Sequence, residues 1–279
     1  MERVEKEKRR MCPNCRAFIT TSDKVCPYCD VQVTPSYRQQ TSDVAGWIPR
    51  DRFTTIVILL INSGLYAAVA VLSIKMAGPE GFMDFDGRVL VAFGAKEPSL
   101  IAHGQWWRYI TAGFLHGGLL HFAMNSWVLF DLGREVEQFF GTARFLVIYF
   151  VSSVTGFVVS NMVSSSISIG ASAAIFGLIG AMIGLGMRTK TPMGAMIRSH
   201  FGRWALYGLL MSFMPFFAID LGAHVGGLAG GFVVGYIADQ PKLVDNLVNK
   251  MWKFAAVACV IITACSFALV FIGLVAALS

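Results

Sequence analysis

Two short stretches of small residues decide the fold of this chain: Gly170-Ala171-Ser172-Ala173 and Gly222-Ala223-His224-Val225-Gly226-Gly227. Each stretch lies inside a segment that is apolar enough to cross a membrane. A histidine at bilayer depth is costly and usually functional, whereas a lone membrane serine usually bonds only helix backbone. Together the two stretches predict a serine nucleophile, with a histidine as its base, inside the membrane.

The composition around these stretches is that of a membrane protein. Of 279 residues, 55% are hydrophobic and only 14% are charged, whereas a soluble domain carries roughly a quarter charged residues. The net charge of +6 does not indicate nucleic-acid binding, because the basic residues fall at the ends of apolar segments, as the positive-inside rule requires. We therefore expect an integral, multi-pass protein in a lipid bilayer.

Seven apolar segments approach the roughly 20 residues that a spanning helix needs. They are 53–76, 118–139, 143–163, 171–187, 202–218, 222–238 and 254–277, whereas region 78–116 is too polar to span. The sixth segment carries two glycine ladders, Gly222/Gly226/Gly230 and Gly227/Gly231/Gly235. Such spacing lets helix backbones approach closely. It is explained either by ordinary tight packing or by a need to hold Ser172 beside His224.

Loop charges predict how the segments are oriented. The loop between the fourth and fifth segments carries Arg188, Lys190, Arg198 and Arg203 and no acid, and the loop before the seventh carries Lys242, Lys250 and Lys253. Residues 1–10 are charged and lack the apolar region of a signal peptide. Alternation from a cytoplasmic N-terminus places both basic loops inside, an arrangement that suits a bacterial plasma membrane.

A pair of CxxC motifs precedes the membrane part. Cys12-Pro13-Asn14-Cys15 and Cys26-Pro27-Tyr28-Cys29 are separated by ten residues. Four thiolates in two such pairs suit one tetrahedral zinc ion. Two disulfides are the alternative, which a reducing compartment disfavours. We expect a small zinc ribbon whose folding depends on the metal and which is structural or recruits a cytoplasmic partner. Cys259 and Cys265, in the last segment, are expected to pack in the core.

Further motifs occur in order along the chain. They are Gly104-Gln105-Trp106-Trp107-Arg108, Phe114-Leu-His116-Gly-Gly-Leu-Leu-His121-Phe-Ala-Met-Asn125, Gly133-x-x-x-Glu137 and the two stretches quoted first. Over about residues 50–240 this series resembles the rhomboid family of intramembrane serine proteases. The common form of the serine motif has glycine where this chain has Ala173, which is also small.

The resemblance implies an all-α polytopic fold, a rhomboid bundle of six core transmembrane helices plus one C-terminal helix. The expected domains are a tail and zinc ribbon at 1–35, a linker at 36–52, the rhomboid core at 53–240, and a cytoplasmic linker with the seventh helix at 241–279. Arg108 and Glu137 are expected to brace loops. Asp220 is expected to cap a helix and not to complete a triad, because rhomboids use a Ser-His dyad.

The chemistry of the four candidate catalytic residues follows from their types and spacing. His224 takes the proton of Ser172 and then gives it to the leaving amine. His121 and Asn125 project from one face of a helix, where both can donate to an oxyanion. Taken alone, Asn125 is better explained by an interhelical hydrogen bond and His121 as a buried polar group, and the resemblance implies the oxyanion role. The resemblance also implies that Phe176, one turn after Ser172, stacks on His224, and simple core packing is the alternative.

We therefore expect an endopeptidase that cleaves in or near the transmembrane helix of a single-pass membrane protein, with no cofactor for catalysis. The resemblance implies small residues at the cut and helix-breaking residues after it. The first alternative is a catalytically silent rhomboid-like protein that binds and escorts membrane helices. A transporter is a weaker alternative, because the segments show no evident inverted repeat.

Overall fold

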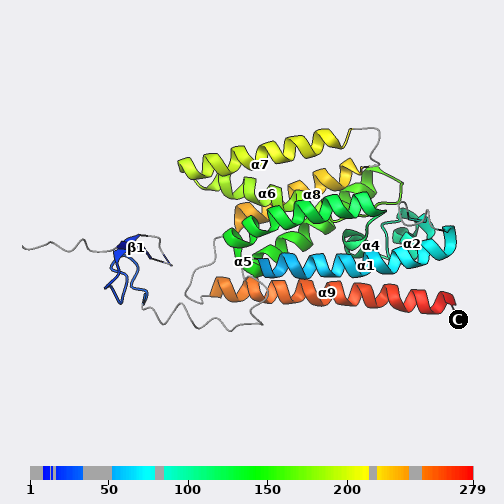
Figure 1. The fold of residues 1–279 in the computed structure, drawn as a ribbon, viewed down its shortest axis with the longest axis horizontal. Helices are drawn as coiled ribbons and strands as arrows, with labels where there is room; N and C mark the ends of the chain where they lie inside the picture. Colours follow the sequence, from blue (N-terminus) through cyan, green and yellow to red (C-terminus); the bar gives the residue numbers. More distant parts are fainter. Residues whose placement is uncertain are drawn as a thin grey trace, which may run out of the picture.

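The computed structural model describes residues 9–12, 14, 17–33, 52–78, 85–213, 219–238 and 247–278. A short antiparallel hairpin, β1 (Arg9–Met11) with β2 (Phe18–Thr20), comes first. The long helices are α1 (Phe53–Ala77), α5 (Leu119–Val163), α6 (Ser172–Arg188), α7 (Pro192–Met211), α8 (Leu221–Ile237) and α9 (Leu247–Leu278). Short helices α2 (Gly87–Ala92), α3 (Pro98–Ala102), α4 (Arg108–Thr111) and the 3-10 turn η4 (Ala112–Phe114) lie between α1 and α5. Figure 1 shows α7 and α9 at opposite edges of the bundle.

The helices form an all-α polytopic membrane protein. By length and composition, Phe53–Met76, Leu119–Val163 and Leu247–Ala276 can each cross a membrane. The backbone of α5 leaves the helical region at Gly141 (φ 70°, ψ 164°), so α5 is an antiparallel pair of helices, as the separate segments 118–139 and 143–163 predict. α6 and α8 have 17 residues each, about 25 Å at 1.5 Å per residue, less than the hydrocarbon core.

Contacts at the two ends of the bundle fix the direction of each helix. At one end, Glu137 meets Thr54 at the start of α1, Arg144 donates to Asn249 at the start of α9, and Arg188 donates to Ile237 at the end of α8. At the other end, the backbone of Phe85 donates to Gly117, and Lys96 reaches the carbonyl of Ser164 after α5. Six core helices and α9 therefore alternate in direction, as the sequence predicts.

The fifth predicted segment is misplaced. The sequence predicts a helix over 202–218, whereas α7 runs from Pro192 to Met211, and 214–218 lie outside the described residues. The Thr191 hydroxyl accepts from the backbone of Gly194, and Pro192 occupies the first turn, which are standard helix-start signals. Arg198 and Arg203 consequently belong to α7 and not to the loop between the fourth and fifth segments, which comprises residues 189–191.

Glu137 braces the bend between the two halves of α5, and it also binds the start of α1, a partner that the sequence does not predict. Its side chain is 4% exposed and accepts hydrogen bonds from the backbone N–H of Thr54 at 3.1 Å and from the Thr54 hydroxyl. The Thr142 hydroxyl donates to the same carboxylate at 3.0 Å. A buried carboxylate needs such donors. Glu137 therefore joins α1 to the bend of α5.

α6 and α8 run parallel and in contact along their whole length. A Cβ at Gly227 would overlap the carbonyl oxygen of Ala173, and one at Gly231 would overlap that of Gly177. Near the other end, a Cβ at Gly184 would lie 2.6 Å from the carbonyl oxygen of Phe232. Only glycine permits this approach. The N-terminal ends of α6 and α8, which carry Ser172 and His224, are therefore held together.

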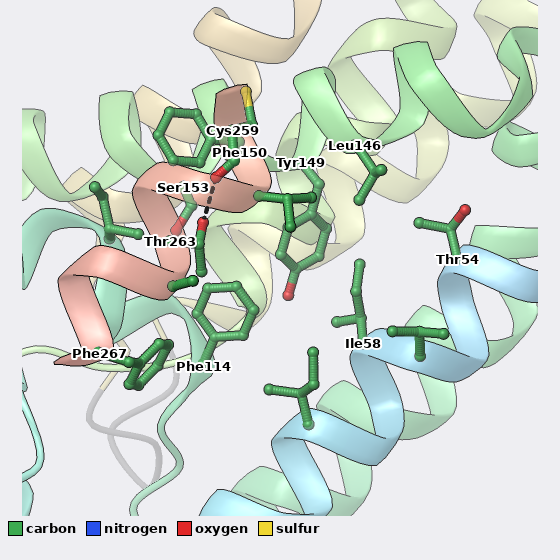
Figure 2. Close-up of a pocket in the computed structure, with 15 residues that line it drawn as sticks. Thr54, Ile58, Phe114, Leu146, Tyr149, Phe150, Ser153, Cys259, Thr263 and Phe267 are labelled. Atoms are coloured by element: carbon green, nitrogen blue, oxygen red, sulfur yellow. Dashed lines mark hydrogen bonds between the residues drawn. The ribbon is translucent and has the colours of Figure 1, made fainter. Parts of the chain in front are cut away.

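A cavity of about 280 Å³ lies between α1, the second half of α5 and α9. Figure 2 shows Phe114 and Tyr149 at its centre, with the Tyr149 hydroxyl directed towards the α1 side near Ile58. On the α9 side, the Thr263 hydroxyl donates to the carbonyl of Cys259 at 2.8 Å. None of the four predicted catalytic residues lines this cavity. The candidate active site is separate from this cavity, because Ser172 and His224 lie near the N-terminal ends of α6 and α8.

Candidate active site

Ser172 is the first residue of α6, as the sequence predicts, and its side chain is half-buried. The preceding Gly170 has φ +128°, a backbone conformation that L side chains rarely adopt. A Cβ at Gly170 would lie 2.8 Å from His121 Nε2 and 3.4 Å from Ser172 Oγ. The absence of a side chain at Gly170 therefore lets the His121 ring and the Ser172 hydroxyl approach the same point beside the Gly170 backbone.

The ring of His224 lies against the first turns of α6. Its centroid is 4.2 Å from that of Phe176, with an interplanar angle of 21°, so the predicted stacking is confirmed. His224 is 6% exposed. Among the described residues, no hydrogen bond joins the hydroxyl of Ser172 to the ring of His224. Catalytic hydrogen bonds are often long in proteins without substrate, so this geometry is compatible with a dyad that closes on substrate.

Asp220 caps α8, as the sequence predicts. Its carboxylate accepts from the backbone N–H of Ala223 at 3.0 Å and from the hydroxyl of Ser160. The capping bond fixes the start of α8 one turn before His224. The carboxylate makes no hydrogen bond to the His224 ring in the described structure, so Asp220 orients the helix and not the imidazole.

The hydrogen bond made by His121 determines which of its nitrogens carries the proton. The backbone N–H of Gly117 donates to His121 Nδ1 at 3.3 Å. In a neutral imidazole the acceptor nitrogen has no proton, so the proton is on Nε2. This is the nitrogen that faces the space beside Ser172. His121 thus presents an N–H donor to the place where the predicted oxyanion forms.

Asn125 is 7% exposed and lies one turn after His121. Its Nδ2 donates to the carbonyl oxygen of His121 at 3.0 Å. The amide therefore bonds its own helix in this structure. The second N–H of the same amide is the donor that its predicted oxyanion contact would use.

Comparison with known proteins identifies the family of this chain. Residues 103–241 match the family model described as Rhomboid domain. YdcA of Bacillus subtilis, whose name describes it as a rhomboid protease, is 33% identical to this chain over 144 residues. The aligned residues cover 51% of this chain and 72% of YdcA. The chain belongs to the rhomboid family. The match contains all four predicted catalytic residues of this rhomboid, together with the whole of α5, α6, α7 and α8.

Two other relatives of this rhomboid are longer proteins. Rhomboid protease GluP of Bacillus subtilis is 40% identical over 153 residues, which cover 55% of this chain and 30% of GluP. Rhomboid-like protease 1 of Toxoplasma gondii is 34% identical over 173 residues, which cover 60% of this chain and 59% of that protein. The chain thus covers less than two thirds of either relative.

Ser212 is a site residue that sequence reasoning missed. It follows the last residue of α7, and its Oγ lies 2.9 Å from His224 Nδ1. The same hydroxyl donates to the carbonyl oxygen of Gly208 at 3.1 Å. The ring of Phe176 packs against Gly208, where a Cβ would lie 2.6 Å from Phe176 Cζ. In this rhomboid, α7 therefore contributes to the surroundings of the predicted base.

Lys96 is a second residue that sequence reasoning did not place. Its side chain is fully buried, and Nζ donates to the carbonyl oxygens of Ser164 and Ser166, both at 2.9 Å. Its backbone pairs with Ser168 through two hydrogen bonds of 3.0 Å. Burial lowers the pKa of Lys96. The ammonium group lies just beyond the C-terminal end of α5, where the helix dipole favours a cation.

These contacts of Lys96 order the segment that precedes Ser172. Residues 165–167 are exposed, and the hydrogen bonds from Lys96 to Ser164 and Ser166 connect this segment to the loop region. After them, the N–H of Gly170 donates to the carbonyl of Ala112 at 3.0 Å. Arg108 braces the loop residues that precede Lys96, as predicted, because its guanidinium donates to the carbonyls of Val91 and Ala95. The loop region between α1 and α5 thus holds the segment that carries Ser172.

The described cysteines of the N-terminal part form a cluster. The sulfur atoms of Cys12, Cys26 and Cys29 all lie within 4.8 Å of one another, and none of these residues is in a disulfide. The Sγ atoms of Cys12 and Cys29 are 3.7 Å apart. A tetrahedral zinc ion with Zn–S bonds of about 2.3 Å holds its sulfur atoms about 3.8 Å apart. The cluster fits a zinc ion, and Cys15, the fourth predicted ligand, lies outside the described residues.

Proposed function

We propose that this rhomboid is a serine endopeptidase that hydrolyses a peptide bond in or near the transmembrane helix of a single-pass membrane protein. The observation that carries the proposal is the meeting of three groups at the N-terminal ends of α6 and α8. Ser172 Oγ and His121 Nε2 face the same space beside Gly170, and His224 stacks on Phe176 one turn further along α6. A nucleophile, an N–H donor and a base are the components that acyl transfer requires.

The reaction runs through an ester on Ser172. The serine oxygen attacks the carbonyl carbon of the scissile peptide bond as His224 Nε2 takes the hydroxyl proton. The C–N bond then breaks, and His224 returns the proton to the leaving amine. Water, activated by the same histidine, hydrolyses the ester and frees the serine. His121 Nε2–H and the N-terminal end of α6 stabilise the oxyanion, and Asn125 adds a donor through the second N–H of its amide.

The position of the site selects the substrate class. α6 and α8 are shorter than the hydrocarbon core, and Ser172 is at the N-terminal end of α6, after a polar segment, residues 164–166, of which 165 and 166 are exposed. The nucleophile therefore lies close to one membrane surface, where water can enter. We place the N-terminus and the basic α6–α7 turn in the cytoplasm of a bacterial cell, and the active site near the outer face.

The test is cleavage by the purified full chain in liposomes. The substrate is a single-pass membrane protein with small residues near one end of its transmembrane helix, and mass spectrometry locates the cut. We expect a cut in or beside that helix. Covalent labelling of Ser172 by a fluorophosphonate, which reports an activated serine whatever the natural substrate, is expected as well. A well-folded protein that neither cleaves several substrates nor reacts with the probe contradicts the proposal.

One observation favours a second candidate, a catalytically silent rhomboid-like protein that binds and escorts membrane helices. Within the described residues, Ser172 and His224 are not hydrogen-bonded to each other. A catalytically silent protein would also lack this hydrogen bond. The two candidates are separated by the fluorophosphonate. Co-purification of a single-pass protein without cleavage or labelling would support the silent protein.

Replacing Lys96 by methionine is expected to lower kcat for cleavage by about 10²-fold, the typical consequence of a small misplacement of a reacting group. Methionine keeps most of the length of the side chain and removes both charge-assisted hydrogen bonds to Ser164 and Ser166. Amide hydrogen exchange of residues 164–170 is expected to accelerate in the same variant. Both quantities are measured on protein in detergent micelles.

Arg88→Met is the matched control for the Lys96 variant. Arg88 is a cation of the same loop region, but it is exposed and pairs with Asp86 at 2.7 Å, where it lowers the Asp86 pKa to about 2. Its replacement is expected to leave kcat and the exchange of residues 164–170 unchanged. Equal losses in both variants would show that loop charge in general, and not the Lys96 contacts, supports activity.

We further propose that the cysteine cluster is a zinc ribbon with Cys12, Cys15, Cys26 and Cys29 as ligands. The zinc is structural: it holds together a hairpin whose core consists of Cys12, Ile19, Cys26 and Val33. A core of this size is too small to be stable without a metal. The ribbon supplies no group to the peptidase reaction, and its role is to bind a cytoplasmic partner.

Zinc content tests the ribbon. The purified chain is expected to contain about one zinc ion per molecule by elemental analysis, and Cys26→Ser is expected to lose it, because three thiolates bind zinc less tightly than four. Cys265→Ser is the control, since Cys265 is an exposed thiol of α9. The proposal is wrong if wild type contains no zinc after purification without chelators, or if both variants retain it equally.

A further inference from the structure

The arrangement of hydrogen bonds around Ser212 assigns a proton position to His224. The Ser212 hydroxyl has one proton and two neighbours that can accept it, the carbonyl oxygen of Gly208 at 3.1 Å and His224 Nδ1 at 2.9 Å. A hydroxyl donates once and accepts through its lone pairs. The direction of the proton decides which nitrogen of His224 remains free to act as a base.

The end of α7 determines that direction. In an α-helix the N–H of Ser212 would donate to Gly208, four residues earlier. Here that N–H donates to Leu209 at 3.0 Å instead. The carbonyl of Gly208 thus does not receive the N–H that a continuing helix would supply, and the Ser212 hydroxyl donates to it instead. A carbonyl oxygen can only accept, and a carbonyl that loses its donor loses free energy of hydrogen bonding, so the hydroxyl proton belongs to Gly208.

The histidine must then be the donor in the other bond. With its proton directed at Gly208, Ser212 Oγ can only accept from His224, so Nδ1 carries the proton and Nε2 has a free lone pair. This is the tautomer that a base needs if it is to take a proton from serine. Charged neighbours do not provide the same restraint, because the Asp220 carboxylate is occupied by Ala223 and Ser160.

We propose that Ser212 is a positioning residue that holds His224 in the Nδ1-protonated tautomer. The proposal rests on the proposed function, in which His224 Nε2 accepts the proton of Ser172. Ser212 does not touch the substrate. Ser212 has the orienting role that a carboxylate has in a catalytic triad, but its acceptor is neutral. It lies at the end of α7, whereas His224 is on α8.

The arrangement also links the base to the position of α7. Phe176 of α6 stacks on the His224 ring and packs against Gly208 of α7, one turn before Ser212. The tautomer is therefore defined only while the end of α7 stays against α6 and α8. A displacement of this end would free His224 to exchange tautomers and would turn off the base without moving Ser172.

Nitrogen-15 NMR of the histidine rings tests the assignment without any requirement for activity. In wild-type protein labelled in its histidines, the His224 resonances, identified by their loss in His224→Ala, are expected to report a proton on Nδ1. In Ser212→Ala they are expected to report a mixture of tautomers. Ser212→Thr, which keeps the hydroxyl, is expected to retain the wild-type signature. A proton on Nε2 in the wild type overturns the proposal.

Kinetics provide the second measurement. Ser212→Ala is expected to lower kcat for cleavage by about 10- to 100-fold, a loss typical of removing the hydrogen-bond partner that orients a functional histidine. KM is expected to stay unchanged, and Ser212→Thr to restore kcat. Ser199→Ala is the control, because Ser199 is an exposed residue of α7 whose hydroxyl accepts from the exposed Arg203. An unchanged kcat in Ser212→Ala also overturns the proposal.

The two proposals fail in different ways. If the protein does not cleave or react with a fluorophosphonate, the proposed function fails while the NMR signature of His224 can still be as expected. If Ser172 proves essential but His224 keeps its tautomer in Ser212→Ala, only the role of Ser212 is wrong.

Discussion

Replacing Ser172 or His224 by alanine is expected to abolish cleavage of a transmembrane substrate in liposomes, with a loss in kcat of about 10⁶-fold for either change. Ser172→Ala removes the attacking oxygen, and His224→Ala removes the group that takes its proton. The two act in one step, so the double variant is expected to be no slower than either single variant. The measurement is single-turnover cleavage with purified, reconstituted protein.

The controls for this experiment lie on α7. Ser199→Ala and His200→Ala remove a serine and a histidine from neighbouring positions of a membrane-domain helix away from the site, and both are expected to cleave at the wild-type rate. Fluorophosphonate labelling is expected to disappear in Ser172→Ala and to slow strongly in His224→Ala. Cleavage that persists in Ser172→Ala would mean that the nucleophile is another residue.

Gly227→Ala is expected to lower the free energy of unfolding by about 3 kcal/mol or more, at the upper end of the range for overpacked sites. The added Cβ would overlap the carbonyl oxygen of Ala173, which is backbone and cannot rotate away. The helices must separate, and Ser172 and His224 separate with them. We expect a large fall in thermal unfolding temperature in detergent, together with loss of fluorophosphonate labelling.

Gly64→Ala is the matched control for this glycine. Gly64 is inside α1, and nothing lies within 4 Å of the position its Cβ would occupy. Alanine there is expected to leave the unfolding temperature unchanged or raise it, because alanine is the better helix former. If both variants lose the same stability, the close approach of α6 and α8 is not what Gly227 provides.

The helices of the bundle were predictable because their signals are local. A run of about 20 apolar residues spans a membrane whatever its partners, so α1, both halves of α5, α6 and α8 appear within a few residues of their expected bounds. The start of α6 at Ser172 was predicted correctly. α7 was misplaced because Arg198, Ser199, His200 and Arg203 lower the hydropathy of its first half, although Thr191 and Pro192 carried a readable start signal.

The predicted site was recovered only in part from sequence. The cap at Asp220 follows from spacing along one helix, whereas the stacking of Phe176 on His224, between α6 and α8, was expected only from the rhomboid resemblance. Lys96 lies in region 78–116, which the sequence shows only to be too polar to span. Its burial against Ser164 and Ser166 joins segments 68 and 70 residues apart in the chain, and no local pattern records such a contact.

The sequence by itself determined the class of this protein: the apolar runs require a helical membrane bundle, and the motif series around Ser172 and His224 assigns it to the rhomboids. Tertiary structure alone decided which groups surround those two residues. The end of α7 brings Ser212 to His224 Nδ1, and the backbone of Gly117 sets the proton on His121. Apolar burial depends on residue type and period, which the sequence displays. A hydrogen bond depends on distances of about 3 Å between atoms of different helices, and those distances exist only once the helices have packed.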